Sequence, residues 1–185
     1  MKDLLRITIV IFLLSSCTKS SLLVEFNCDN KYFKDLEKVT DVKNLFSVEI
    51  PNNWKTNLFY DDLQSSIYTA DTTKQLTETI LLDITFINKQ IRFNDNFQLK
   101  VEQENLYKKL IQTKKVIKTF KSKLTFIAVS KGRKEKYNYK KIEAYIKINE
   151  DNFILAKAEI YGDSLVKERT CKAINILNKI DINQL

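Results

Sequence analysis

The chain has 185 residues, the size of one domain with a single core, and its 31 Lys and Arg against 23 Asp and Glu give a formal net charge of +8 at pH 7. It contains no histidine, which excludes His-based catalytic triads, the usual general base near neutral pH and most transition-metal sites. The basic balance is compatible with an anionic partner. The chain is also rich in Lys, Asn and Ile, a combination that AT-rich codon usage produces in every protein of such a genome. We therefore expect the base composition of the genome, rather than the function of the protein, to set the charge.

The first 16 residues have the layout of an export signal. Lys2 and Arg6 form a basic start, residues 7–14 form an apolar run, and Ser15 and Ser16 are small residues before a cysteine. A permanent membrane span needs about 20 apolar residues, so this run is too short to stay in the bilayer. We therefore expect residues 1–16 to be a cleaved signal peptide.

Residues 14–17, Leu-Ser-Ser-Cys, resemble the lipobox of bacterial lipoproteins, in which the cysteine thiol receives a lipid. The resemblance implies lipidation of Cys17, a lipidated tether over residues 17–22 and a single domain over residues 23–185. Acyl chains contribute about 0.8 kcal/mol per buried CH₂ and would hold the mature chain on a membrane. Thr18, in place of Asp, favours an outer-membrane location facing the periplasm. The alternative is a conventional signal peptide with a cysteine nearby by chance.

Once Cys17 is used for the lipid, Cys28 and Cys171 remain, one near each end of the folded part. An even pair in an oxidising compartment predicts a disulfide, which would stabilise the chain by about 4 to 5 kcal/mol in the loop-entropy description. Two separate buried thiols are the alternative, because sequence does not show the distance between the two residues. Two cysteines without a histidine or a CxxC motif form no recognisable metal ligand set, so we expect no metal.

In the first half of the chain, apolar alternation and continuous apolar runs predict strands at residues 46–50, 56–60, 65–69 and 79–88. In the first strand, Phe46, Val48 and Ile50 should point inward. A capping cluster at residues 94–96 precedes a predicted amphipathic helix over 97–112. The apolar stripe of this helix would comprise Leu99, Leu106, Tyr107, Leu110 and Ile111.

The second half returns to strands, predicted at residues 115–120, 124–130, 136–149 and 152–161, with a tight turn at 149–152. Gly162 then opens a closing helix that Asp163 is expected to cap. Its buried stripe would comprise Val166, Thr170, Ala173, Ile174, Leu177 and Ile180. This element order predicts an α+β fold, an antiparallel β-sheet flanked by helices.

Residues 46–55, an alternating strand followed by Pro51-x-x-Trp54, and residues 66–71, a strand that ends in Asp71, resemble the opening of PsbP-like and Mog1-like domains. The resemblance in element order extends over about residues 46–179. It implies an α/β/α sandwich and a non-enzymatic accessory that docks on a larger assembly. The metal-associated residues of photosynthetic members have no counterpart that we can assign, and no cofactor is expected. Trp54 would pack over the end of the sheet or, alternatively, anchor a partner.

No catalytic constellation is apparent, so we expect the protein not to be an enzyme. The carboxylate pairs Asp61/Asp62 and Glu102/Glu104 are adjacent or two residues apart, which predicts ordinary solvated charges. The sequence contains no glycine-rich phosphate loop and no serine in a nucleophile elbow.

A basic hairpin with interleaved tyrosines is predicted around Gly132, which would form its turn. Its candidate surface patch comprises Lys131, Arg133, Lys134, Lys136, Lys140 and Lys141. These cations could contact anionic lipid headgroups or glycans, with Tyr137 and Tyr139 at the interface. The alternative is a solvated hairpin whose lysines protect a sheet edge from aggregation. Nucleic acid is not an expected partner outside the cytoplasm.

Together these features predict a lipid-anchored module of the bacterial cell envelope that docks on an unknown envelope protein. The alternative is a periplasmic carrier of a lipid or another apolar ligand. A small-molecule ligand would require an apolar cavity of about 300 Å³ or more, whereas a docking module should have a filled interior.

Overall fold

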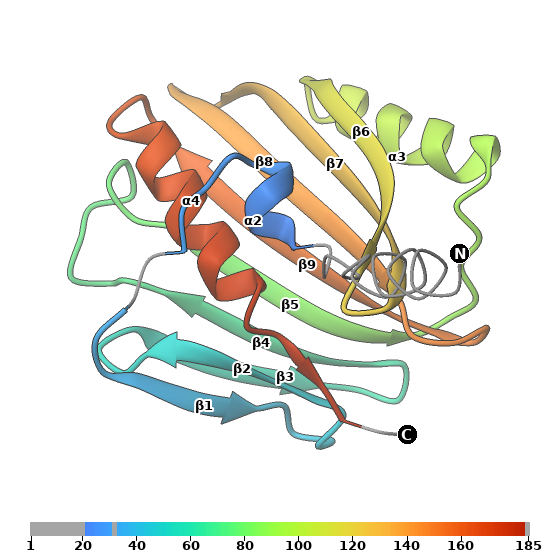
Figure 1. Cartoon of the computed structure of the whole chain (residues 1–185). Coiled ribbons are helices and arrows are strands. Elements are labelled where there is room, and N and C mark those ends of the chain that lie inside the picture. Colours follow the sequence, from blue (N-terminus) through green and yellow to red (C-terminus); the bar gives the residue numbers. More distant parts are fainter. Residues whose placement is uncertain (1–20, 31–32, 184–185) are drawn as a thin grey trace, which may run out of the picture.

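The computed structural model describes residues 21–30 and 33–183, which form two antiparallel sheets and three helices (Figure 1). The large sheet has the strand order β3-β4-β5-β9-β8-β7-β6, and the small sheet has the order β1-β2-β10. The strands of the large sheet are β3 (Lys55–Tyr60), β4 (Gln64–Ala70), β5 (Leu81–Asn88), β6 (Leu110–Phe120), β7 (Lys123–Lys134), β8 (Tyr137–Lys147) and β9 (Asn152–Tyr161). The remaining elements are β1 (Leu36–Thr40), β2 (Phe46–Pro51), β10 (Asp181–Ile182), α2 (Leu22–Glu25), α3 (Asp95–Tyr107) and α4 (Val166–Leu177).

The main core lies between one face of the large sheet and a layer formed by α4, α2 and the small sheet (Figure 1). Alternate residues of the central strands, such as Ile84, Ala156 and Ile142, point into this core and meet Ile174 of α4 and Val48 of β2. A second, smaller core lies on the other face, where α3 packs on the sheet. The α+β fold class predicted from the sequence is confirmed.

The strand predictions agree closely with the structure at residues 46–50, 56–60, 65–69 and 152–161, and Phe46, Val48 and Ile50 are buried as expected. The small sheet was not predicted. Its strand β1 exposes Glu37 and Lys38 and has no clear apolar alternation, and β10 is only two residues long. Because β2 pairs with these two strands, it belongs to the layer above the large sheet and not to the large sheet itself.

The predicted apolar stripe of the helix before β6 is wrong. Helix α3 ends at Tyr107, so Leu110 and Ile111 lie on β6, and Leu99, Leu106 and Tyr107 are exposed. The helix buries Val101 and Asn105 instead, because the position of α3 on the sheet, rather than its leucine spacing, decides which side is covered. The predicted capping cluster is confirmed at Asn94, whose side chain accepts a hydrogen bond from the Phe97 N–H at 3.0 Å.

The closing helix α4 buries most of its predicted stripe, including Thr170, Ala173, Ile174 and Leu177. The predicted cap is wrong. The residue before the helix is Leu165, in the left-handed region with φ 48°, and no side chain caps the helix. The Asp163 carboxylate instead accepts hydrogen bonds from Asn138 Nδ2, at 2.9 and 2.8 Å.

A disulfide joins Cys28 to Cys171, with a Cα–Cα distance of 5.3 Å. It fastens the segment that follows α2 to the middle of α4, and Asn175 Nδ2 of α4 donates a hydrogen bond to the Asp29 carbonyl nearby. The N-terminal segment is therefore held on the same face as the small sheet (Figure 1).

The predicted signal peptide over residues 1–16, Cys17 and most of the tether lie outside the described residues. Among the helices that the structure describes, none combines the length and the apolar character that crossing a bilayer requires.

Candidate functional site

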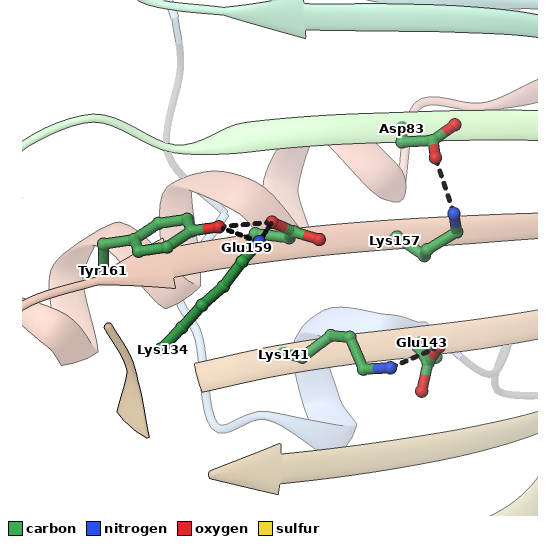
Figure 2. Close-up of polar contacts among 7 residues, drawn as sticks. All are labelled: Asp83, Lys134, Lys141, Glu143, Lys157, Glu159 and Tyr161. Atoms are coloured by element: carbon green, nitrogen blue, oxygen red, sulfur yellow. Dashed lines mark hydrogen bonds and ion pairs between the residues drawn. The ribbon is translucent and has the colours of Figure 1, made fainter. Parts of the chain in front are cut away.

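The second face of the large sheet is only partly covered, because α3 packs near β6, β7 and β8 and leaves the surface toward the β3–β4 hairpin open. We call this uncovered surface the open face. Its polar centre consists of residues from four strands, whose side chains form three neighbouring groups of contacts (Figure 2). These residues are Asp83, Lys134, Lys141, Glu143, Lys157, Glu159 and Tyr161.

The strand register places opposite charges next to one another on the open face. Asp83 of β5 lies opposite Lys157 of β9, which lies opposite Glu143 of β8, and in the next row Glu159 lies opposite Lys141. Lys157 Nζ and Asp83 Oδ2 form an ion pair at 2.6 Å (Figure 2). Facing charges of opposite sign stabilise antiparallel pairing, and in the polar centre the three lysines balance the three carboxylates.

Tyr161 links two of these charges. Lys134 Nζ donates a hydrogen bond to Tyr161 Oη at 2.7 Å, and Tyr161 Oη donates to Glu159 Oε2 at 2.9 Å (Figure 2). The bond to Tyr161 raises the pKa of Lys134, and burial raises the pKa of Tyr161. The phenol therefore stays protonated, and this end of the open face presents a fixed cation beside a fixed anion.

Lys141 and Glu143 form the most deeply buried ion pair of the open face. Their side chains are 7% and 8% exposed, and Lys141 Nζ lies 2.9 Å from Glu143 Oε1. The buried Asn105 of α3 donates a hydrogen bond to Glu143 Oε2 at 3.3 Å. This contact explains why α3 buries a polar residue, since the amide supplies a partner to a carboxylate that water reaches poorly.

Two neighbouring hollows of about 500 Å³ each lie on the open face, and both are lined by Leu155 and Lys157; we call the two together the depression. Phe59 and Tyr68 line one end of it, and Tyr139 and Tyr145 line the other. Burial raises the pKa of both Tyr139 and Tyr145, which keeps these phenols neutral. The depression combines aromatic walls with charged centres, an arrangement suited to binding a polar surface.

The described ranges 21–30 and 33–183 contain no group of three or more His, Cys, Asp or Glu side chains that could hold a metal ion. The carboxylates Asp83, Glu143 and Glu159 of the open face each have a lysine or tyrosine partner.

The six cations of the predicted basic patch do not form one surface. Consecutive residues of a strand point to opposite faces, so Lys134 and Lys141 lie on the open face, whereas Lys140 points to α4 and donates to Thr170 Oγ1 at 2.9 Å. Lys131, Arg133 and Lys136 are exposed.

The predicted turn at Gly132 is wrong. Gly132 lies within β7, and the turn falls at Glu135, which has a φ of 55°. A Cβ atom on Gly132 would come within 2.4 Å of the Lys109 carbonyl oxygen. The glycine is therefore required because the segment between α3 and β6 crosses it closely.

Sequence reasoning missed Asp83, Lys157, Glu143 and Glu159 as a site. A signal was present, since Lys141/Glu143 and Lys157/Glu159 are opposite charges two residues apart within apolar strands. On a strand that spacing places both charges on one face.

Trp54 is partly buried and packs against the main core, in agreement with a packing role. It also lines a separate hollow of about 410 Å³ beside Arg169. Arg169 is buried, and its guanidinium donates hydrogen bonds to the backbone carbonyls of Ser164, Thr79 and Tyr161. This arginine holds the loop before α4 in place.

Lys140 makes the stability depend on pH. Burial, together with the charges of Lys131 and Lys114, lowers the pKa of Lys140 to about 8. The unfolded chain, in which a lysine has a pKa of about 10.4, then binds more protons, so the free energy of unfolding should increase between about pH 8 and pH 10. Lys140→Met should flatten this increase and raise the free energy of unfolding at neutral pH by about 1 kcal/mol. Urea unfolding across this pH range measures both effects, and the exposed Lys136→Met is the control. An unchanged slope in Lys140→Met would contradict the assignment.

The strand order, the helices on both faces of the large sheet and the small sheet above it define a PsbP/Mog1-like fold. No protein-family model and no curated protein matches the chain. Among solved structures, the chain is similar to cyanobacterial PsbP (CyanoP) from Synechocystis sp. PCC 6803, with 8% identity and a TM-score of 0.57 over 84% of this chain and 97% of that chain.

A protein from Bacteroides thetaiotaomicron is similar at 10% identity, with a TM-score of 0.51, over 81% of this chain and 49% of that chain. The Ran-binding protein Mog1p from Saccharomyces cerevisiae matches at 10% identity, with a TM-score of 0.49, over 80% of this chain and 95% of that chain. The likeness to the first two structures, both with TM-scores above 0.5, shows the fold alone, because the identities are 8% and 10%.

Proposed function

We propose that the mature protein is a non-enzymatic module of the bacterial cell envelope that is anchored by lipid at Cys17 and docks on an envelope protein through its open face. The observation that carries the proposal is the depression of the open face, formed by two neighbouring hollows, with alternating charges between aromatic side chains.

The chemistry of the open face suits recognition of a protein. Phe59 and Tyr68, which are 58% and 36% exposed, offer large contact areas of the kind that anchor interfaces. The rows Asp83–Lys157–Glu143 and Glu159–Lys141 alternate in sign, so a partner must match them in position, which favours specificity over raw affinity.

The same features make a carrier of apolar molecules the weaker candidate. A binding site for a lipid tail needs a mainly apolar enclosure, whereas the depression is open and lined by Lys141, Glu143, Lys157 and Glu159. The main core is filled by side chains such as Phe46, Phe86 and Ile146.

The envelope location is supported by the signal-like N-terminus, the lipobox-like residues 14–17 and the disulfide. Disulfides persist in oxidising compartments such as the periplasm and are rare in the cytosol. The Thr after Cys17 favours the outer membrane, with the folded domain facing the periplasm.

Photocrosslinking in intact cells tests the proposal. A benzophenone amino acid at Phe59, on the open face, should capture one reproducible envelope protein, which mass spectrometry identifies. The matched control is Tyr60, which neighbours Phe59 on β3, is similarly exposed at 66% and points to the other face. Lys157→Glu should reduce the yield from Phe59 about tenfold, because it reverses one charge in the row. Cys17→Ala should release the protein from the membrane fraction.

Equal capture from Phe59 and Tyr60, or capture that Lys157→Glu leaves unchanged, would contradict docking through the open face. Recovery of lipid alone from Phe59 would favour the carrier. Unchanged membrane fractionation of Cys17→Ala would contradict the anchor and leave the docking result to be judged separately.

A further inference from the structure

The β6–β7 hairpin carries a run of positive charge that no acidic residue interrupts. Residues 114–123, which we call the lysine hairpin, contain Lys114, Lys115, Lys118, Lys121 and Lys123 and no acidic residue. Lys114, Lys118 and Lys123 lie on the face of the large sheet that carries α2 and α4, while Lys115 points to the other face, toward Glu102. The lysine hairpin is distinct from the predicted patch around Gly132, and the open face does not include it.

The lysine hairpin lies beside the point where the described chain begins. The carboxylate of Glu25, in α2, forms ion pairs with Lys114 and Lys118, and Lys114 Nζ also donates to the Glu25 carbonyl at 2.8 Å. Glu25 is partly buried, and although burial alone would raise its pKa, the two lysines hold its pKa below the ordinary value. Helix α2 begins directly after Ser21, whose hydroxyl bonds to Asn178 at the end of α4. One carboxylate thus neutralises part of the positive charge and fixes the hairpin against the N-terminal segment.

The surface around this contact has the other features of a membrane-facing region. Val24 of α2 is 73% exposed beside Glu25. Lys121 and Lys123 line a hollow of about 560 Å³ together with Asn149, Asp181, Ile182 and Asn183, and the Asp181 carboxylate is paired with Lys38. A basic surface that also exposes an apolar side chain is typical of proteins that lie on anionic bilayers.

The anchor limits which surface can face the membrane. Three residues separate Cys17 from Ser21, so a lipidated Cys17 would hold Ser21 within about 14 Å of the bilayer at full chain extension. The β7–β8 hairpin, which turns at Glu135, lies at the opposite end of β7, a strand of 12 residues that spans about 36 Å. Of the two basic hairpins, only the lysine hairpin lies at the end of β7 that is close to α2, where the described chain begins (Figure 1).

We propose that the lysine hairpin binds the anionic headgroups of the bilayer that holds the lipid anchor, and so fixes the orientation of the domain on the membrane. This proposal rests on the anchor at Cys17 that is part of the proposed function. Each lysine close to an anionic surface should strengthen the attachment about fivefold, and salt should weaken it because the charges are screened beyond about 8 Å at physiological ionic strength.

The test uses the acylated protein in vesicles and an environment-sensitive fluorophore, whose emission increases when water is excluded from it. With Cys17 acylated and Cys28 bonded to Cys171, an added cysteine is the sole free thiol of the chain. Ser122→Cys places the label at the tip of the lysine hairpin, and Tyr107→Cys, at a position 91% exposed near the other end of β6, is the control. Vesicles of phosphatidylcholine are compared with vesicles that also contain phosphatidylglycerol.

Emission from the label at Ser122 should rise about twofold or more with phosphatidylglycerol, fall again at high salt, and stay unchanged at Tyr107. Lys118→Gln with Lys121→Gln should abolish the rise. Lys131→Gln with Lys136→Gln, which removes the same charge from the β7–β8 hairpin, should leave the rise unchanged. An acylated chain whose Ser122 label does not respond to phosphatidylglycerol would contradict this proposal alone, and so would equal responses from the two double variants. A chain that mass spectrometry shows to lack acylation would instead contradict the anchor.

Discussion

Loss of the Cys28–Cys171 disulfide is expected to lower the free energy of unfolding by about 4 kcal/mol. The bond joins residues 143 positions apart, so it restricts a very large loop in the unfolded chain. It also keeps the segment after α2 on α4, where Asn175 binds the Asp29 carbonyl. The double variant Cys28→Ala/Cys171→Ala, compared with the parent by urea unfolding without reductant, measures the effect.

Addition of a reductant gives the control for this experiment. It should lower the unfolding midpoint of the parent to that of Cys28→Ala/Cys171→Ala and leave the variant unaffected. Equal midpoints of oxidised and reduced parent would contradict a stabilising role for the bond. Hydrogen exchange should show that α2 loses protection before α4, because α2 has only four residues and depends on its attachment.

The second large effect is expected at the buried pair Lys141–Glu143. Glu143→Leu should lower the free energy of unfolding by about 3 to 5 kcal/mol, because it leaves the Lys141 ammonium buried without its partner. The combined variant Lys141→Met/Glu143→Leu should recover most of this loss, since two apolar side chains replace the pair. Urea unfolding of Glu143→Leu, of Lys141→Met and of the combined variant gives the coupling energy between the two side chains directly.

The ion pair Asp83–Lys157 is the matched comparison on the same face. Its side chains are 30% and 28% exposed, so water screens the interaction and Lys157→Met should cost about 1 kcal/mol or less. If Glu143→Leu lowered the free energy of unfolding no more than Lys157→Met, the proposed strengthening of the Lys141–Glu143 pair by burial under α3 would be contradicted.

The parts of the fold that sequence predicts well are those where local pattern and tertiary position agree. Phe46, Val48 and Ile50 alternate with polar residues and lie in the main core, so the alternating pattern of the strand predicted their burial correctly. For α3 the pattern and the position disagree. Leu99 and Leu106 follow helical spacing, but the sheet surface beneath the helix meets Val101 and Asn105.

The candidate site was predictable only in part, for a reason that lies in strand geometry. Counting charges along residues 131–141 groups Lys140 with Lys141, yet adjacent residues of β8 point to opposite faces, toward α4 and toward the open face. The partners of Lys141 and Lys157 come from α3 and β5, far away in sequence, so the alternating rows follow from the strand order and register. The even number of cysteines that remain after Cys17 predicted a disulfide between Cys28 and Cys171. The Cα–Cα distance that permits the bond, however, follows from the packing of α2 on α4.

The small sheet has a consequence for the order in which the molecule is assembled. Its strand β2 begins at Phe46 and pairs with β10, whose residues Asp181 and Ile182 lie more than 130 positions later in the chain. A ribosome or a secretion pore that releases the chain from its N-terminus delivers β2 long before its neighbour is available. The β2–β10 edge of the small sheet can therefore form only after residues 181 and 182 have emerged, whereas the β1–β2 pair needs no later residue.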